Sequence, residues 1–527
     1  MGTASNTEAD GGAGAERDTG APPDTTTAHT NFDSETAPGT DTRTAFDTAT
    51  GSTDSDLPDG GDIAEPDTEP DAGGDGPSYA EPALVVSSPD DYWIEAEPTH
   101  LQAGDGETEV VVDDSVRYQT WDGFGGTFNE KGWEALSYLD DDERELALSL
   151  LFDPVVGARL AWGRLPIGAS DYALDRYTLN DTPDDLEMAH FSIDRDREML
   201  IPYVRAAMAH RPDLRLWAGA WTPPPWMKDN GDYDGGSLKD DPDIRAAYAL
   251  YLARYVEAYQ DEEGLFLDSI HLQNEPRYIE TYPSCQWSPW SFRDFIRDFL
   301  GPTFADRGVS AGIWLGDLSN LQDHQYLYAV MDDQNAARYI SGFGVQWYAD
   351  HFIPEAAAAF PELPIMQTEH ICGNPPWEAE IFVPEHPPND HAYGEYSFDQ
   401  ILLYLKAGVN AYMAWNLVLD ETGLSLDEAR PWPQNSLMSV HRERGELTLH
   451  PAYYVFRHFS AFIDRGAVRV NADGFENCVA FENPDGTIVV VMANHTNEPQ
   501  RLNLSLHGGV IRVDLPARGW ATVNHLP

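Results

Sequence analysis

The chain has 527 residues, of which 90 are acidic and 32 are basic, so its formal net charge at pH 7 is −58. This charge argues against binding to nucleic acid or to an anionic membrane surface, because both would repel it. The longest apolar run has about seven residues, far fewer than the roughly 18 of a membrane-spanning helix. The sequence therefore predicts a soluble protein.

Acidic residues are in excess along the whole chain, and only four lysines are present. This combination predicts adaptation to high salt, where concentrated ions screen the repulsion between like charges. The alternative is an acidic protein of ordinary salt tolerance. The three cysteines, at positions 285, 372 and 478, show neither C-x-x-C nor zinc-finger spacing, so the sequence predicts no disulfide scaffold and no zinc site.

Residues 1–85 form an acidic leader with 19 acidic and 2 basic residues and few aromatic ones. Such a segment buries too little apolar surface to offset the entropy of ordering, so we expect it to be disordered. It begins without a basic region followed by an apolar one, so no signal peptide is predicted. Its composition is typical of a spacer behind a removed signal or lipid anchor, which leaves a secreted or cell-surface location and a cytoplasmic one both open.

Short apolar strands alternate with helical patterns over the next 340 residues or so. The candidate strands are residues 120–126, 159–163, 215–220, 269–274, 311–316, 342–347, 364–368 and 409–415. The clearest helical patterns are 141–152, 194–210, 243–259, 291–304 and 398–407. This alternation predicts an α/β fold of the (β/α)8 TIM-barrel type. A doubly wound open sheet is the alternative, but the chain lacks its glycine-rich turn.

A small all-β module follows the barrel. After a closing helix at 451–463, short β runs appear at 478–482, 487–493, 500–506, 510–515 and 520–523. Turn sequences such as N-P-D-G and H-G-G separate them. We expect strands within 86–118 to join this β-sandwich, with the barrel at 119–463 and the rest of the sandwich at 464–527.

Chemistry-bearing residues follow the predicted barrel strands. The carboxyl ends of the strands form the catalytic mouth of such a barrel. Glu275 follows the fourth strand and Glu369 the seventh, and several aromatic residues share this end. A carboxylate pair with aromatic platforms is what hydrolysis of a glycosidic bond requires. Chance placement is the alternative, because the chain holds 90 acidic residues.

Several ordered motifs occur from about residue 119 to 470. They are Q-T-W-D-G-F-G-G (119–126), R-L-P-I-G-A-S-D-Y (164–172), L-N-D-T-P-D-D (179–185), W-T-P-P-P-W-M-K-D-N-G (221–231), L-Q-N-E-P (272–276), Q-T-E (367–369) and H-F-S-A-F-I (458–463). With these motifs the chain resembles glycoside hydrolase family 30, closest to its glucosylceramidase-type branch. The resemblance implies a (β/α)8 barrel with a sandwich built from both flanks of the barrel.

The resemblance also implies a retaining mechanism on two glutamates. Glu369 would be the nucleophile and Glu275 the acid/base. Asn274 would donate a hydrogen bond to the sugar 2-hydroxyl. Arg164 would orient the carboxylates, although a purely structural buried ion pair is an equal alternative.

Further site residues follow from the same resemblance. Asp171 and Trp221 would bind hydroxyl groups and the sugar face, with Trp415 as the opposing wall. Tyr348 would donate a hydrogen bond to the nucleophile. Gln346 stands where the glucosylceramidase pattern has a histidine, and Asn435 matches an asparagine at the aglycone entrance. Two more residues, Trp287 and Trp290, either line the leaving-group side or belong to the core.

Three functions compete at this point. The first is a retaining β-glucosidase of the glucosylceramidase type, acting on a carbohydrate or glycoside without a metal or cofactor. The second is an endo-acting β-1,6-glucanase or xylanase of the same family. The third is a non-catalytic surface protein that binds carbohydrate through an inactive barrel, which the presence of both glutamates disfavours.

High net charge generates the first prediction. Because only concentrated ions screen the repulsion among the acidic side chains, we expect hydrolysis of aryl β-glucosides to collapse in dilute buffer. The measurement compares the initial rate in concentrated salt with the rate in dilute buffer. Full activity in dilute buffer would contradict salt adaptation.

Overall fold

The computed structural model describes residues 83–101 and 109–526. Most of the predicted leader, including the start at which no signal peptide is predicted, lies outside the described residues. The last three residues of the leader differ from the expectation of disorder, because the first strand, β1, spans Ala83–Ser87. Its apolar residues Leu84 and Val85 are buried, which gives this short segment the surface that orders it.

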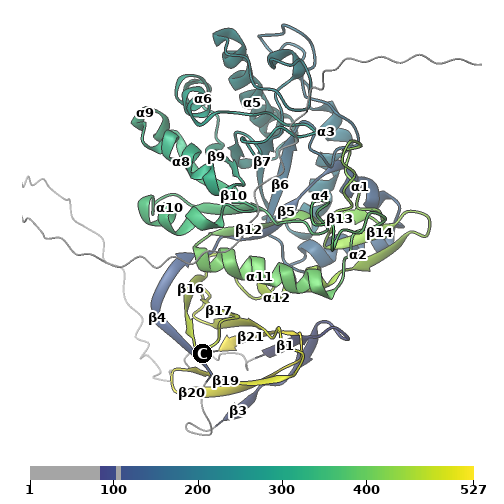
Figure 1. Ribbon diagram of the computed structural model, residues 1–527, viewed down its shortest axis with the longest axis vertical. Helices are drawn as coiled ribbons and strands as arrows, with labels where there is room; N and C mark the ends of the chain where they lie inside the picture. Colours follow the sequence, from purple (N-terminus) through teal and green to yellow (C-terminus); the bar gives the residue numbers. More distant parts are fainter. Residues whose placement is uncertain (1–82, 102–108, 527) are drawn as a thin grey trace, which may run out of the picture. The chain divides into compact units, whose positions relative to one another are not determined.

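Eight parallel strands close into a barrel in chain order, with β12 paired to β5 (Figure 1). They are β5 (Gly123–Thr127), β6 (Trp162–Ile167), β7 (Arg215–Ala220), β8 (Leu267–His271), β9 (Gly312–Leu318), β10 (Ile340–Gln346), β11 (Ile365–Glu369) and β12 (Ala411–Asn416). This closure confirms the predicted barrel. The open doubly wound sheet is wrong, because neither β5 nor β12 is a free edge.

Helices follow the strands and form the outer layer of the barrel. They are α1 (Glu130–Ser137), α2 (Asp141–Phe152), α3 (Asp194–Glu198), α4 (Leu200–His210), α5 (Pro242–Glu263), α6 (Pro289–Phe295), α7 (Gly301–Arg307), α8 (His324–Met331), α9 (Gln334–Ala337), α10 (Ile353–Ala359), α11 (His391–Ala407) and α12 (Pro451–Ser460). Short side chains set the ends: Asp241 caps α5 by accepting from Ile244 N, and Gly264 ends it with φ +66°.

Glycines let the first two barrel strands approach each other closely. A Cβ on Gly125 of β5 would collide with the carbonyl oxygen of Trp162, and one on Gly163 of β6 would collide with the ring of Phe128. The glycines of the G-F-G-G motif are therefore required by backbone packing.

Strands from both flanks of the barrel form one ten-stranded sheet that folds into a sandwich. The strands are β1, β2 (Ile94–Ala96), β3 (Thr99–Leu101), β4 (Val110–Thr120), β16 (Val468–Asp473), β17 (Cys478–Glu482), β18 (Ile488–Ala493), β19 (Gln500–Leu506), β20 (Gly509–Leu515) and β21 (Trp520–Leu526). Their order is β2-β1-β21-β18-β17-β16-β4-β19-β20-β3. The chain thus enters and leaves the barrel through the same sheet.

Strand β18 is buried on both of its faces. Ile488, Val490 and Met492 belong to the sandwich core, whereas Val489 and Val491 pack into the barrel core. This arrangement explains why the strand is apolar at every position rather than at alternate ones. The sandwich and the barrel therefore share a continuous apolar interface.

Helices α11 and α12 lie between the barrel strands and the sandwich (Figure 1). His458 of α12 is fully buried there, with Nε2 2.8 Å from Ser87 Oγ and Nδ1 2.9 Å from Thr522 Oγ1. Burial lowers the pKa of His458 to about 3, so the ring stays neutral and bridges two sandwich strands.

A small sheet that the sequence did not predict follows β12. It contains β13 (Val418–Asp420), β14 (Met438–His441) and β15 (Glu446–Leu449). Residues Leu417 and Leu437 beside it are buried, and Val418 contacts α1 through Gly132. The small sheet therefore anchors the loop after the eighth barrel strand.

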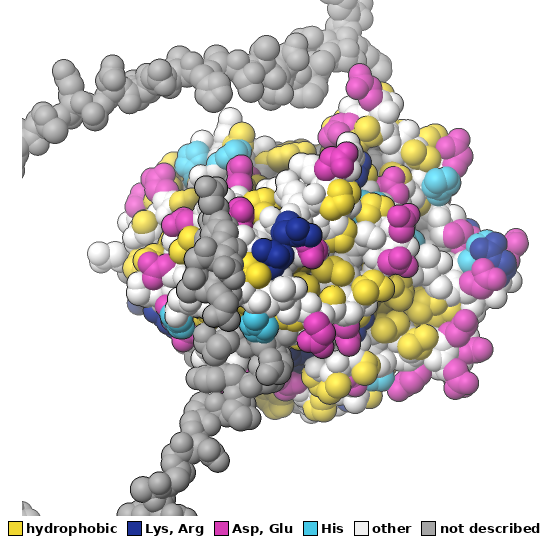
Figure 2. All heavy atoms as spheres, turned by 90° about the horizontal axis from the view of Figure 1, so that it is seen from below, with side chains coloured by type: hydrophobic (Ala, Val, Ile, Leu, Met, Phe, Trp, Pro, Cys, Tyr) yellow, Lys and Arg dark blue, Asp and Glu magenta, His cyan; other side chains and the backbone are white. Residues whose placement is uncertain are grey.

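Acidic side chains are spread over the face in Figure 2, where Lys and Arg side chains are few. Among the described residues, no helix is both long and apolar enough to cross a membrane.

Candidate active site

The two candidate catalytic glutamates lie at the carboxyl ends of the fourth and seventh barrel strands. Glu369 is the last residue of β11 and is 5% exposed. Glu275 follows β8, and its backbone N–H donates to the carbonyl of Asp317 at 3.1 Å. Glu275 has φ +48°, a left-handed conformation that costs energy in a residue other than glycine and that concentrates at functional sites.

A fully buried arginine joins the two strand ends. Arg164 Nη1 donates to Glu369 Oε2 at 2.6 Å, and its Nη2 donates to Asn274 Oδ1 and Asp317 Oδ2, both at 2.8 Å. The guanidinium also lies 4.6 Å from the ring centroid of Trp221. Arg164 thus forms a buried ion pair and also orients the carboxylate of Glu369. The sequence analysis gave these two roles as alternatives.

Arg164 does not end its strand as the sequence predicted. The expected second strand stopped at residue 163, but β6 continues to Ile167. Here the charge of Arg164 is neutralised by Glu369 and Asp317, so the strand continues through it.

Asp317, at the end of β9, positions this arginine. Its second oxygen, Oδ1, is 2.6 Å from His271 Nδ1. Burial alone would raise the pKa of Asp317, but His271 and Arg164 hold it below its ordinary value. Asp317 therefore stays ionised and fixes the position of the guanidinium.

The two glutamates have different hydrogen-bond partners. Glu369 Oε1 accepts from Trp347 Nε1 at 2.9 Å in addition to its ion pair with Arg164. Glu275 Oε2 accepts from the hydroxyl of Tyr282 at 3.3 Å and forms no ion pair with a described residue. Burial, and then the negative charge of Glu369, raise the pKa of Glu275 well above its ordinary value. Burial also raises the pKa of Glu369, but Arg164 and Trp347 oppose this effect. These environments favour the proton on Glu275 and the negative charge on Glu369.

Trp221 and Trp415 form one aromatic surface rather than opposing walls. Their ring centroids are 5.7 Å apart with an interplanar angle of 22°. A sugar held between two rings needs roughly 7–8 Å, twice a carbon–carbon contact distance. The expectation that Trp415 faces Trp221 across the sugar is therefore wrong, because the two indoles stack on each other over Arg164.

Asp171 and Asn274 have the polar atoms expected at a sugar site. Asp171 is 6% exposed, and burial together with the charge of Glu369 raises its pKa to about 8. Asn274 Oδ1 accepts from Arg164 and, at 3.4 Å, from Gln346 Nε2. Its amide oxygen is thereby occupied, which leaves Nδ2 as a donor for a ligand. Gln346 is in turn fixed by Thr368, whose hydroxyl donates to Gln346 Oε1 at 2.9 Å.

Tyr348 does not take the role that the resemblance implied. It is 47% exposed, and its hydroxyl has no hydrogen bond to Glu369. Glu369 accepts a hydrogen bond from the indole of Trp347 instead. The reason lies in the backbone: Trp347 has φ +53°, and the register of β10 shifts beside Gln346. The alternation of side chains along the strand is broken at this point. Trp347, one position before Tyr348, therefore faces Glu369.

An apolar cavity of about 530 Å³ adjoins Trp347 and Tyr348. Trp347 and Tyr348 line it, and so do residues of the loop after β11: Ile371, Cys372, Gly373, Asn374, Pro375, Trp377, Glu378, Ile381 and Val383. Asn435 also lines it, and its Nδ2 donates to Pro388 O and Asn389 Oδ1, both at 2.9 Å. Asn435 therefore holds a loop at the cavity wall.

Sequence reasoning assigned no role to four residues of the site. Trp347 and Tyr282 donate to the two glutamates, Asp317 pairs with Arg164, and His271 contacts Asp317. Asp317 gave a signal, because an acidic residue stands near the end of the fifth predicted strand, in W-L-G-D-L. Trp347 and Tyr282 gave none beyond their aromatic character.

Trp287 is a core residue that is 4% exposed, with its Nε1 donating to Gln273 at 3.2 Å. Trp290 is exposed on α6 and does not line the apolar cavity beside Trp347.

No group of three or more His, Cys, Asp or Glu side chains within the described ranges is arranged to hold a metal ion. The site thus combines two buried carboxyls in unequal environments with an aromatic surface formed by two stacked indoles.

Comparisons with known proteins agree with this geometry. The "Glycosyl hydrolase family 30 TIM-barrel domain" model matches residues 121–463, and the "Glycosyl hydrolase family 30 beta sandwich domain" model matches residues 466–523. Lysosomal acid glucosylceramidase of Mus musculus is 30% identical over 419 residues, which cover 75% of this chain and 79% of the relative. Endo-1,6-beta-D-glucanase of Aspergillus fumigatus is 26% identical over 434 residues, which cover 76% of this chain and 84% of the relative. The crystal structure of SrfJ from Salmonella typhimurium has a TM-score of 0.76 at 24% identity, covering 84% of this chain and 99% of that one.

The charge of Glu369 raises the pKa of Glu275, and this coupling can be tested directly. In the Glu369→Gln variant the neighbouring negative charge is absent, so we expect the pKa of Glu275 to fall. Carbon-13 NMR of labelled glutamate, titrated in the native chain and in the variant, measures this shift. As a control, Glu280→Gln changes a more distant carboxyl and should lower the pKa less. An unchanged pKa in Glu369→Gln would show that the two carboxyls are not coupled.

Proposed function

The chain belongs to glycosyl hydrolase family 30, and within these retaining O-glycosyl hydrolases we propose that it is a β-glucosidase for glucosides with an apolar aglycone. We propose Glu369 as its nucleophile and Glu275 as its acid/base. The observation that carries these roles is the unequal environment of the two carboxyls: Arg164 and Trp347 stabilise the anion on Glu369, whereas Glu275 keeps a proton.

The first step forms a covalent glycosyl-enzyme. A carboxylate oxygen of Glu369 attacks the anomeric carbon while Glu275 donates its proton to the leaving oxygen, so the glycosidic bond breaks as the ester bond forms. Asn274 supports this step, because its Nδ2 is available to the 2-hydroxyl, a contact that strengthens in the oxocarbenium-like transition state.

The second step reverses the role of Glu275. Once Glu369 is an ester, its negative charge is gone, and the pKa of Glu275 falls. Glu275 can then take a proton from water, which attacks the anomeric carbon and releases Glu369 as a carboxylate. Arg164 compensates the returning charge. The same two side chains therefore serve both halves of the reaction.

Substrate preference rests on the apolar cavity of about 530 Å³ beside Glu369. It shares Trp347 with the nucleophile, so a group leaving from the anomeric carbon has this cavity next to it. Trp377 and Ile381 line it and are 52% and 56% exposed, which leaves apolar surface for an aglycone to bury. The resemblance to the mouse glucosylceramidase supports the same substrate class.

An endo-acting β-1,6-glucanase is the second candidate. It is favoured by the Aspergillus fumigatus endo-1,6-beta-D-glucanase, which matches 76% of the chain. The two candidates differ in the aglycone, which is apolar in one case and a further sugar in the other.

Chemical rescue tests the assignment of the two glutamates. In Glu369→Gly we expect hydrolysis of an activated aryl β-glucoside to fall by several orders of magnitude, because the covalent path is lost. Added azide should occupy the vacated space, restore turnover and yield the α-glucosyl azide, identified by proton NMR. The matched variant Glu275→Gly retains the nucleophile and should give the β-glucosyl azide. A β-azide from Glu369→Gly would assign the nucleophile to another residue.

The cavity generates a prediction about aglycones. We expect kcat/KM for octyl β-glucoside to exceed that for methyl β-glucoside, and Trp377→Ala to reduce the octyl value by roughly tenfold with little effect on the methyl value. Phe266→Ala is the control, because Phe266 is 68% exposed and does not line the cavity. Cleavage inside β-1,6-glucan chains, without octyl preference, would favour the endo-glucanase instead.

A further inference from the structure

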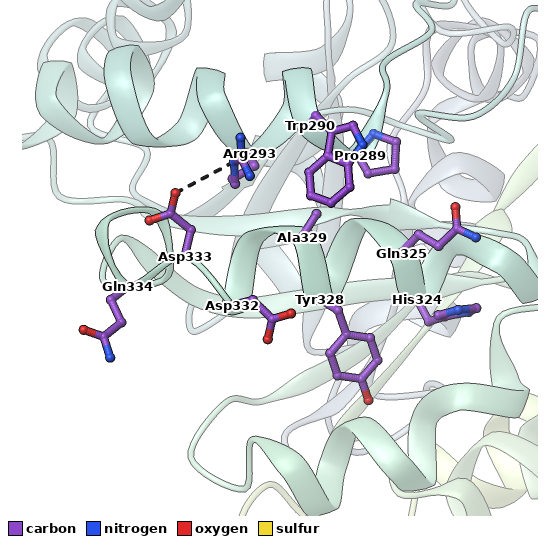
Figure 3. A pocket seen from close by; sticks show the side chains of 10 residues that line it. All are labelled: Pro289, Trp290, Arg293, His324, Gln325, Tyr328, Ala329, Asp332, Asp333 and Gln334. Carbon is purple, nitrogen blue, oxygen red and sulfur yellow. Dashed lines mark ion pairs between the residues drawn. The ribbon is translucent and has the colours of Figure 1, made fainter.

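A second groove lies between α6 and α8 (Figure 3). Its volume is about 780 Å³, within the range of roughly 300–1,000 Å³ that is usual for small-molecule sites. None of the residues that line it also lines the apolar cavity, and none has a hydrogen bond to Glu275 or Glu369. The groove is therefore a separate feature of the barrel surface.

Trp290 is the dominant side chain of this groove, and the fold makes little use of it. It is 61% exposed, and within the described ranges its ring contacts no other aromatic ring. Trp287, three residues earlier, packs against Phe292 and Phe295 in the core and is 4% exposed. A large aromatic ring that stays uncovered retains apolar surface for a ligand to bury.

The position of this indole is fixed before any ligand arrives. Ser288 Oγ accepts from Ser291 N at 3.0 Å and Ser291 Oγ accepts from Ser288 N at 2.9 Å, a reciprocal cap at the start of α6. Arg293 lies against the ring, 5.2 Å from its centroid, and pairs with Asp294 at 2.6 Å. A preformed platform lowers the entropy that binding must overcome.

The facing wall comes from α8 and the residue after it. Ala329 lies opposite the indole in Figure 3, where its small side chain keeps the groove open. The hydroxyl of Tyr328 donates to Glu355 at 3.1 Å, which holds the phenol in place. Gln325 and Asp332 have no hydrogen-bond partner for their side chains within the described part of the chain, so their donors and acceptors are available.

Charges around the groove select a neutral ligand. Asp332 opposes an anion, whereas the charge of Asp333 is balanced by Arg297, which pairs with it at 3.0 Å, and by Arg293. Arg293 already lies against the indole and opposes a second cation there. A polyhydroxylated molecule satisfies both conditions, because its C–H face stacks on the ring and its hydroxyls pair with Gln325 and Asp332.

We propose that this groove binds a neutral β-linked polysaccharide chain; the choice of carbohydrate rests on the proposed function as a glycosidase. Trp290 and Gln325 lie in the first turns of helices that follow β8 and β9. Those turns lie at the end of the barrel that carries the catalytic glutamates. A chain held there is kept beside the mouth of the active site.

The test is affinity electrophoresis of the full chain in gels containing β-1,6-glucan or xylan. It uses a Glu275→Gln background, in which the polysaccharide is not degraded. We expect Trp290→Ala to weaken retardation about tenfold and Trp290→Phe to preserve most of it, because a phenyl ring still stacks. Phe266→Ala is the matched control, since Phe266 is 68% exposed and precedes β8 at the opposite end of the barrel. Retardation should persist in concentrated salt, because the ligand is neutral.

Equal retardation of Trp290→Ala and Phe266→Ala would overturn the proposal, and so would absence of retardation by both polysaccharides or its loss in concentrated salt. Failure of the proposed function has a different signature. If no glycoside is hydrolysed but retardation depends on Trp290, the groove binds carbohydrate and the catalytic assignment is wrong. If aryl β-glucosides are hydrolysed and Trp290→Ala changes no retardation, the catalytic assignment stands and the groove proposal is wrong.

Discussion

The buried ion pair between Arg164 and Glu369 is the interaction on which the site depends. A carboxylate removed from water takes up a proton unless a partner stabilises its charge, and breaking such a pair costs about 3–5 kcal/mol. Arg164 supplies that partner at 2.6 Å, and Asp317 fixes the arginine from the other side. Because the anion stays on Glu369, the proton stays on Glu275. One guanidinium thus creates the asymmetry that two-step hydrolysis needs.

Much of the fold could be predicted because its signals are local. The alternation of strands and helices gave the barrel, and the predicted strand at 364–368 differs from β11 by one residue at each end. Helices α8 and α10 are not among the clearest helical patterns of the sequence, because both are short and α10 consists largely of alanine. The sheet formed by β13, β14 and β15 was missed because its pairing joins segments about twenty residues apart.

The site was predictable where a residue's role follows from its place on a strand. Glu275, Glu369 and Asn274 stand at strand ends within recognisable motifs, and the structure brings them together around Arg164. The contact of Trp347 with Glu369 was not predictable, because it depends on one left-handed residue that reverses the facing of neighbouring side chains. The stacking of Trp221 on Trp415 likewise depends on how far apart the ends of β7 and β12 lie in the closed barrel.

The two-sided burial of β18 has a consequence for how the protein can be divided. A barrel expressed alone would expose the patch that Val489 and Val491 cover, and the sandwich alone would expose those same side chains. Exposed apolar patches of this kind favour aggregation. The chain therefore cannot be divided between the barrel and the sandwich without exposing apolar surface. A truncated or recombined protein would have to keep the two parts together.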